Sequence, residues 1–145
     1  MHEIRALGPL LGWCGHLARE RMDARLAQSG VTPAQARVLH YLYHHGNQAP
    51  QCEVTEHLRV KPSTANGILD RMEEKGLVER TALAGDARKK LIVLTEKGGA
   101  LQETCRQVFL ETETLLMCGL SAQEQEKLFA MLRRVMNNLE EDRTT

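Results

Sequence analysis

The segment from Pro62 to Gly76 restricts the fold of this chain more than any other. Its apolar residues recur at the i, i+3, i+4 and i+7 spacing that places side chains along one face of an α-helix. They are Ala65, Ile68, Leu69 and Met72. Proline suits the first position of a helix, and glycine the position just past its end. The sequence therefore predicts a helix of about four turns between Pro62 and Gly76.

The opposite face of this helix carries small or uncharged groups and one arginine. These residues are Ser63, Thr64, Asn66, Gly67 and Arg71. A face without bulky side chains can approach a surface closely, so it suits insertion into a groove. Just upstream, Glu53–Leu58 predicts a shorter helix, and only residues 59–61 separate the two. Such a pair is a helix-turn-helix; the alternative is a generic helix pair in an all-α core.

A β-hairpin is predicted directly after this helix. Leu77–Thr81 and Lys90–Leu94 are rich in β-forming residues and flank residues 82–89, which contain Gly85. A hairpin in this place is a wing. Its tip and descending side carry Arg88, Lys89 and Lys90. These cations suit contact with DNA phosphates or the minor groove, and the alternative is a solvated loop end.

Capping signals place the remaining helices. Thr32 with Gln35 and Ser121 with Glu124 form capping boxes, and Thr95 is a further N-cap. The expected helices cover residues 9–28, 33 to about 46, 96 to about 118 and 122 to about 139. The last two carry more apolar surface than the winged helix-turn-helix can cover. A second copy of the chain is expected to cover it, because a twofold dimer buries the same patch twice.

Length and charge are consistent with one small domain. The chain has 145 residues, only 3% of them aromatic, and zero net charge. Residues 59–94 nevertheless hold eight basic and five acidic side chains, which permits a local basic face. We predict a mainly α fold with a small β-hairpin wing. Residues 1–30 and 96–145 would supply dimerisation helices around a winged helix-turn-helix lobe at residues 31–95.

The cysteines and the N-terminal segment favour a cytoplasmic chain without a membrane partner. Cys14, Cys52, Cys105 and Cys118 show no C-x-x-C spacing, which indicates a reducing compartment rather than a disulfide framework. The apolar run from Ala6 to Cys14 is too short to span a bilayer and makes a poor signal peptide.

Four segments in this order and spacing resemble the MarR family of bacterial transcription regulators. They are Val31–Gln35, Leu69–Val78, Gly85–Arg88 and Leu94–Gly98, and the resemblance extends over nearly the whole chain. It implies a homodimer in which the first, fifth and sixth helices interlock. Each subunit would read half of a palindromic operator in double-stranded DNA, and the protein would act as a repressor.

The resemblance also implies roles for single residues. Ser63, Thr64, Asn66 and Gly67 would face base edges in the major groove, at a helix that begins with Pro62. Arg71 would meet the DNA backbone, and Arg88, held by Asp86, would enter the minor groove. Arg59, Thr55 and Gly67 depart from residues common in the family, so the operator sequence cannot be carried over.

Relatives of this kind commonly respond to small aromatic or phenolic effectors. Candidate lining residues are Trp13, His16, His40 and Tyr43, and each is equally compatible with an ordinary core or surface position. Cys14 lies where some relatives sense oxidants, but the tyrosines that hold such a thiolate are missing. Oxidant sensing through Cys14 and a winged helix used for protein contact remain the alternatives.

Enzymatic and metal-binding functions find no support in the sequence. It contains no G-x-S-x-G, no phosphate-binding loop and no H-E-x-x-H. The spacing of His44, His45, Cys52 and His57 matches no compact metal-ligand motif. We therefore predict a regulator that is not an enzyme and has no cofactor.

Overall fold

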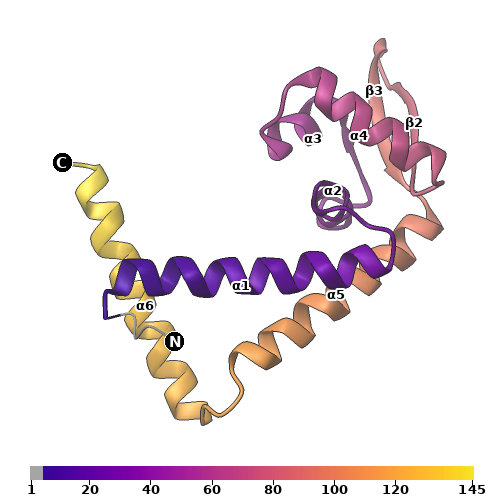
Figure 1. Cartoon of the computed structure of the whole chain (residues 1–145). Coiled ribbons are helices and arrows are strands. Elements are labelled where there is room, and N and C mark those ends of the chain that lie inside the picture. Colours follow the sequence, from indigo (N-terminus) through magenta and orange to yellow (C-terminus); the bar gives the residue numbers. More distant parts are fainter. Residues whose placement is uncertain (1–4) are drawn as a thin grey trace. The chain divides into compact units, whose positions relative to one another are not determined.

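The computed structural model describes residues 5–145, which form six helices and three strands (Figure 1). Residues 1–4 of the predicted dimerisation segment lie outside the described residues. In chain order the elements are α1 (Leu7–Gln28), α2 (Pro33–Tyr43), β1 (Gln48–Pro50), α3 (Gln51–Leu58), α4 (Pro62–Glu74), β2 (Val78–Leu83), β3 (Asp86–Leu94), α5 (Glu96–Leu116) and α6 (Ala122–Arg143). The chain divides into two compact units, and the boundary along the sequence falls between Thr112 and Glu113.

The core of the first unit lies between α2, α3, α4 and the sheet. Its fully buried side chains include Val38, Leu39, Leu42, Val54, Leu69, Met72, Leu77 and Ile92. Ala65, Leu69 and Met72 of α4 are all buried, so the predicted apolar stripe is confirmed. A mainly α fold with a small β wing is likewise confirmed, and α4 leads directly into the hairpin.

The sheet has the order β1-β3-β2, and both pairings are antiparallel. No strand was expected between the second helix and the helix at Glu53–Leu58, but Gln48–Pro50 forms β1 and pairs with Leu91–Val93. The wing strands are also longer than predicted. Leu83 pairs with Asp86, which leaves Ala84 and Gly85 as the turn. The wing tip buries few side chains, so its strands lack the alternating pattern that would have identified them.

The predicted capping residues are confirmed at three helices. The Thr32 and Ser121 side chains each accept a hydrogen bond from the third helical amide, and the Gln35 and Glu124 side chains bond back to the capping residues. Thr95 Oγ1 accepts a bond of 3.0 Å from the amide of Gly98. The first helix begins at Leu7 rather than Pro9, because proline is tolerated in a first turn where no N–H is needed.

Helices α1, α5 and α6 leave large apolar side chains exposed in the single chain. On α1 these are Leu7, Leu10, Leu11, Trp13 and Leu17, on α5 they are Phe109, Leu110, Leu115 and Leu116, and on α6 they are Phe129, Met131, Met136 and Leu139. Helix α6 has no buried residue at all within the described chain. Among residues 5–145, no helix is both long enough and apolar enough to cross a membrane.

Candidate nucleic-acid interface

Helix α4 presents its polar face to solvent. Pro62, Ser63, Thr64, Asn66, Gly67 and Arg71 are all exposed. A Cβ atom added to Gly67 would meet no atom within 4 Å, so the surface is open at that point. The helix begins at Pro62 and has its buried stripe against α2, α3 and β2, which fixes the direction of the polar face.

The wing tip carries its three consecutive cations in β3. Arg88 is 94% exposed, and its Nε lies 3.5 Å from Asp86 Oδ1. The same carboxylate oxygen accepts a hydrogen bond of 3.0 Å from the Arg88 amide. Asp86 therefore contacts both the backbone amide and the guanidinium of Arg88. Lys89 and Lys90 are exposed beside it.

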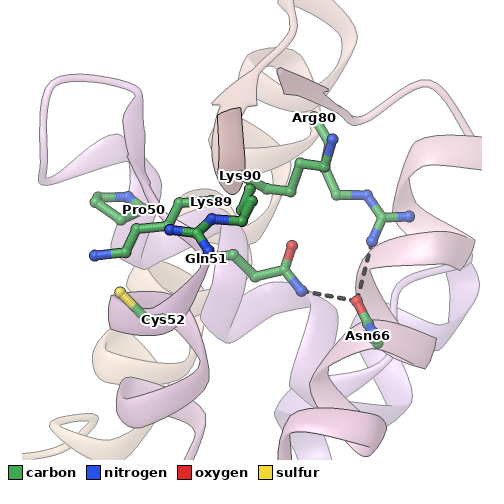
Figure 2. Close-up of a pocket in the computed structure, with 8 residues that line it drawn as sticks. Pro50, Gln51, Cys52, Asn66, Arg80, Lys89 and Lys90 are labelled. Carbon is green, nitrogen blue, oxygen red and sulfur yellow. Dashed lines mark hydrogen bonds between the residues drawn. The ribbon is translucent and has the colours of Figure 1, made fainter. Parts of the chain in front are cut away.

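A groove of about 530 Å³ separates the wing from the start of α3 and from α4 (Figure 2). Its lining residues are Pro50, Gln51, Cys52, Asn66, Arg80, Arg88, Lys89 and Lys90. The groove thus brings Asn66 together with the three cations of the wing. It offers hydrogen-bond donors and positive charge along one continuous surface, which suits an anionic polymer with polar edges.

Four lining residues of this groove were not predicted from the sequence as DNA-binding residues: Pro50, Gln51, Cys52 and Arg80. Arg80 of β2 hydrogen-bonds to Asp70 and Glu73 of α4, and its Nη1 lies 3.3 Å from Asn66 Oδ1. The bond to Asp70, aided by Glu73, raises the pKa of Arg80 further above its ordinary value. Gln51 donates to the same Asn66 oxygen at 2.7 Å. The only signal in the sequence was that Arg80, in a predicted strand, follows a predicted helix that carries Asp70 and Glu73.

A second, more apolar cavity of about 560 Å³ lies in the first unit. Its apolar lining is Met22, Leu26, Ala36, Cys105, Phe109 and Leu110, and its polar lining is Arg37, His40, Tyr43, His44, His57, Gln102 and Arg106. Gln102 is 5% exposed, and its Oε1 has no hydrogen-bond partner within the described residues. An apolar cavity with a few convergent polar groups is typical of a small-molecule site.

Two histidines of this cavity, His40 and His57, have pKa values lowered in the direction of the neutral form. Burial, with smaller contributions from His44 and His57, lowers the pKa of His40 below its ordinary value. Burial also lowers the pKa of His57, and the nearby positive charge of Arg37 adds to the effect. The guanidinium groups of Arg37 and Arg106 are the permanent positive charges at the cavity.

The four candidate effector residues do not come together. His40 and Tyr43 line the cavity, whereas Trp13 and His16 do not. They stack on each other on α1, with ring centroids 5.3 Å apart. Cys14 is exposed on the same helix, and it is a free thiol like the other three cysteines. No three metal-ligating side chains gather within residues 5–145.

Comparison with known proteins relates this arrangement to solved structures. A mutant of MepR from Staphylococcus aureus is 30% identical with a TM-score of 0.86, over 92% of this chain and 98% of that chain. A second MepR mutant, bound to an oligodeoxyribonucleotide, is 30% identical with a TM-score of 0.72 over 94% and 99%. The reduced form of MarR from E. coli is 28% identical with a TM-score of 0.77 over 92% and 98%.

A family model agrees with these similarities. The model described as the MarR family matches residues 29–89, from the end of α1 to the tip of the wing. The matched segment thus contains the polar face of α4 and most of the groove. Since a solved relative also matches at 30% identity over nearly its whole length, the chain belongs to the MarR family.

Proposed function

We propose that this protein is a homodimeric repressor that binds a palindromic operator in double-stranded DNA and is released by a small aromatic effector. One observation carries the proposal: Asn66, on the exposed polar face of α4, and the three cations of the wing line the same groove. A helix face of this kind fits the major groove, while a protruding arginine fits the minor groove. Members of the MarR family are transcription regulators and not enzymes.

The relatives support double-stranded DNA as the partner. One MepR mutant is bound to an oligodeoxyribonucleotide, and a mutant of E. coli MarR is complexed with operator DNA. By the same reasoning, Ser63, Thr64, Asn66 and Gly67 would face base edges. Arg71, Lys89 and Lys90 would contact phosphates.

The exposed apolar side chains of α1 and α6 support self-association. An uncovered helix face with several large apolar residues is a typical protein-contact surface. In the proposed dimer, residues 5–30 and 96–145 supply the contact between subunits, and residues 31–95 form the reading lobe. Two lobes related by a twofold axis would then read two half-sites of a palindrome.

Footprinting tests this proposal. The purified protein would be incubated at low salt with duplex DNA from around its own gene, and its oligomeric state measured by sedimentation. We expect a dimer that protects two symmetric half-sites. Their centres should be separated by one helical turn of DNA, roughly 10 base pairs, or by a multiple of it. A stable monomer, or a protein that protects no duplex at low salt, would contradict the proposal.

The Arg88→Ala substitution tests the wing. We expect it to weaken operator binding by about 1 to 3 kcal/mol, because Arg88 would lose its contact in the minor groove. Fluorescence anisotropy with a labelled operator measures this loss. Arg25→Ala, which removes the same charge from an exposed position on α1, serves as the control and should leave the affinity nearly unchanged once sedimentation shows that this variant is as dimeric as the native protein. Equal affinities of the two variants would remove the wing from the mechanism.

The effector part of the proposal rests on the apolar cavity. A panel of phenols and aromatic acids would be screened for release of the operator, and the active compound titrated into variants. We expect His40→Ala and Tyr43→Ala to weaken the response about 2- to 10-fold, as loss of an aromatic contact does. His16→Ala is the matched control, because His16 lies outside the cavity lining. A response lost only in the His16→Ala variant would place the effector elsewhere.

A further inference from the structure

Asn66 is held on the reading face of α4 by two donors. Its Oδ1 accepts hydrogen bonds from Gln51 Nε2 at 2.7 Å and from Arg80 Nη1 at 3.3 Å. Figure 2 shows both bonds meeting at the same oxygen, one from α3 and one from β2. Arg80 is itself anchored to Asp70 and Glu73 of α4. The amide of Asn66 is therefore clamped between two side chains before any DNA arrives.

The chemistry of arginine decides which way this amide points. A guanidinium carries only donors, so the Asn66 atom that faces Arg80 must be the oxygen. Rotating the amide by half a turn would place its NH₂ group against the donors of Arg80 and Gln51. The nitrogen Nδ2 consequently points away from both clamping residues. The oxygen and nitrogen of an amide have nearly the same shape, so the orientation of Asn66 is assigned from the hydrogen-bonding capacity of its neighbours.

The clamp also exhausts the accepting capacity of Asn66. A carbonyl oxygen has two lone pairs, and two donors already occupy them. The usual reading of adenine by asparagine needs both amide groups, because the oxygen accepts from N6 while the nitrogen donates to N7. A clamped Asn66 lacks the first of these bonds. It also lacks the acceptor that the N4 amino group of cytosine requires.

Resting on the DNA-binding function proposed above, we propose that Asn66 reads the operator as a donor only and selects guanine. Guanine offers two adjacent acceptors in the major groove, O6 and N7, which match the two protons of one NH₂ group. Gln51 and Arg80 are positioning residues, since they act on the base through Asn66. The buried Oε1 of Gln51, which has no partner within the described chain, is the cost of turning Nε2 toward Asn66.

Selection from random duplexes tests this assignment. Base preferences of the native protein would be compared with those of Asn66→Ala, which identifies the position in each half-site that depends on Asn66. We expect guanine there, preferred over adenine by roughly 5- to 150-fold, and we expect Asn66→Ala to abolish the preference. A native preference for adenine or cytosine at this position would overturn the inference.

Gln51→Ala tests the clamp itself. With one lone pair of Asn66 released, adenine should become acceptable at the same position, while preferences at other positions stay unchanged. Arg80→Lys retains a donor toward Asn66 and should keep the preference for guanine. Lys89 lines the same groove, and the Lys89→Ala substitution should weaken binding to all sequences equally. Thermal unfolding of each variant checks that the reading lobe is folded.

The outcomes separate this inference from the function on which it rests. If the native protein binds no duplex, the proposed function fails and the inference fails with it. If it binds an operator and Gln51→Ala leaves the whole preference profile unchanged, only the inference fails. A change in preference confined to one position cannot result from a general loss of stability, because that would weaken all sequences alike.

Discussion

The Gly98→Ala substitution is expected to lower the free energy of unfolding by about 3 kcal/mol, near the upper end of overpacking effects. Gly98 is buried in the first turn of α5. A Cβ atom there would overlap the carbonyl oxygen of Leu77 and lie 2.7 Å from Leu94 Cδ1. The backbone of Leu77 cannot turn aside, because its carbonyl also accepts hydrogen bonds from the Thr95 side chain and amide. Urea unfolding followed by circular dichroism measures the loss.

The neighbouring glycine provides a matched control for this effect. A Cβ added to Gly99 would meet no atom within 4 Å, and the residue lies in the same helix turn. Gly99→Ala should therefore stabilise the protein by roughly 0.5 to 1 kcal/mol through higher helix propensity. Similar changes in the two variants would mean that α5 does not approach the start of the wing as closely as described.

Operator affinity is expected to fall by about 10³- to 10⁵-fold between 50 and 200 mM salt, provided that about six to ten phosphates are contacted. The count is reasonable because each subunit exposes Arg71, Lys89 and Lys90, the three cations proposed to contact phosphates. A dimer would double this set. Fluorescence anisotropy at several salt concentrations gives the slope. Since Lys90→Ala removes one cation from each subunit, the slope should become shallower by about two in that variant.

A weak dependence on salt would favour a different role for the wing. Contact with a protein through a mixed surface does not release the condensed counterions of DNA. Binding that changes little over this range would therefore support the alternative of a winged helix used for protein contact. The control measurement is the salt dependence of the dimer itself, since dissociation of subunits would also weaken binding.

Local signals predicted the capped starts of α2, α5 and α6 because the residues responsible lie close together in sequence. Thr32 and Gln35, or Ser121 and Glu124, interact across a single turn, and their side chains act as the sequence suggests. The polar and apolar faces of α4 follow from helical period alone. Strand β1 was missed because its partner in β3 lies more than forty residues away and its own three residues show no β pattern.

In the groove, too, only the residues that share one element could be predicted from the sequence. The sequence identified Asn66, Arg88 and the lysines beside it, because one helix face and one charge run were enough. Arg80 and Gln51 lie 14 and 15 residues from Asn66, on different elements, and only folding brings them to its oxygen. The cavity likewise combines α1, α2, α3 and α5, so His40 and Tyr43 could be separated from Trp13 and His16 only by the structure.

The open space above Gly67 has a consequence for how this regulator could change its target. No neighbouring atom requires a glycine at that position, and a larger residue would raise helix propensity by up to about 1 kcal/mol. A substitution at Gly67 could therefore add a new side chain to the polar face of α4 and at the same time raise the free energy of unfolding. A change of operator specificity at this position would therefore not require a loss of stability.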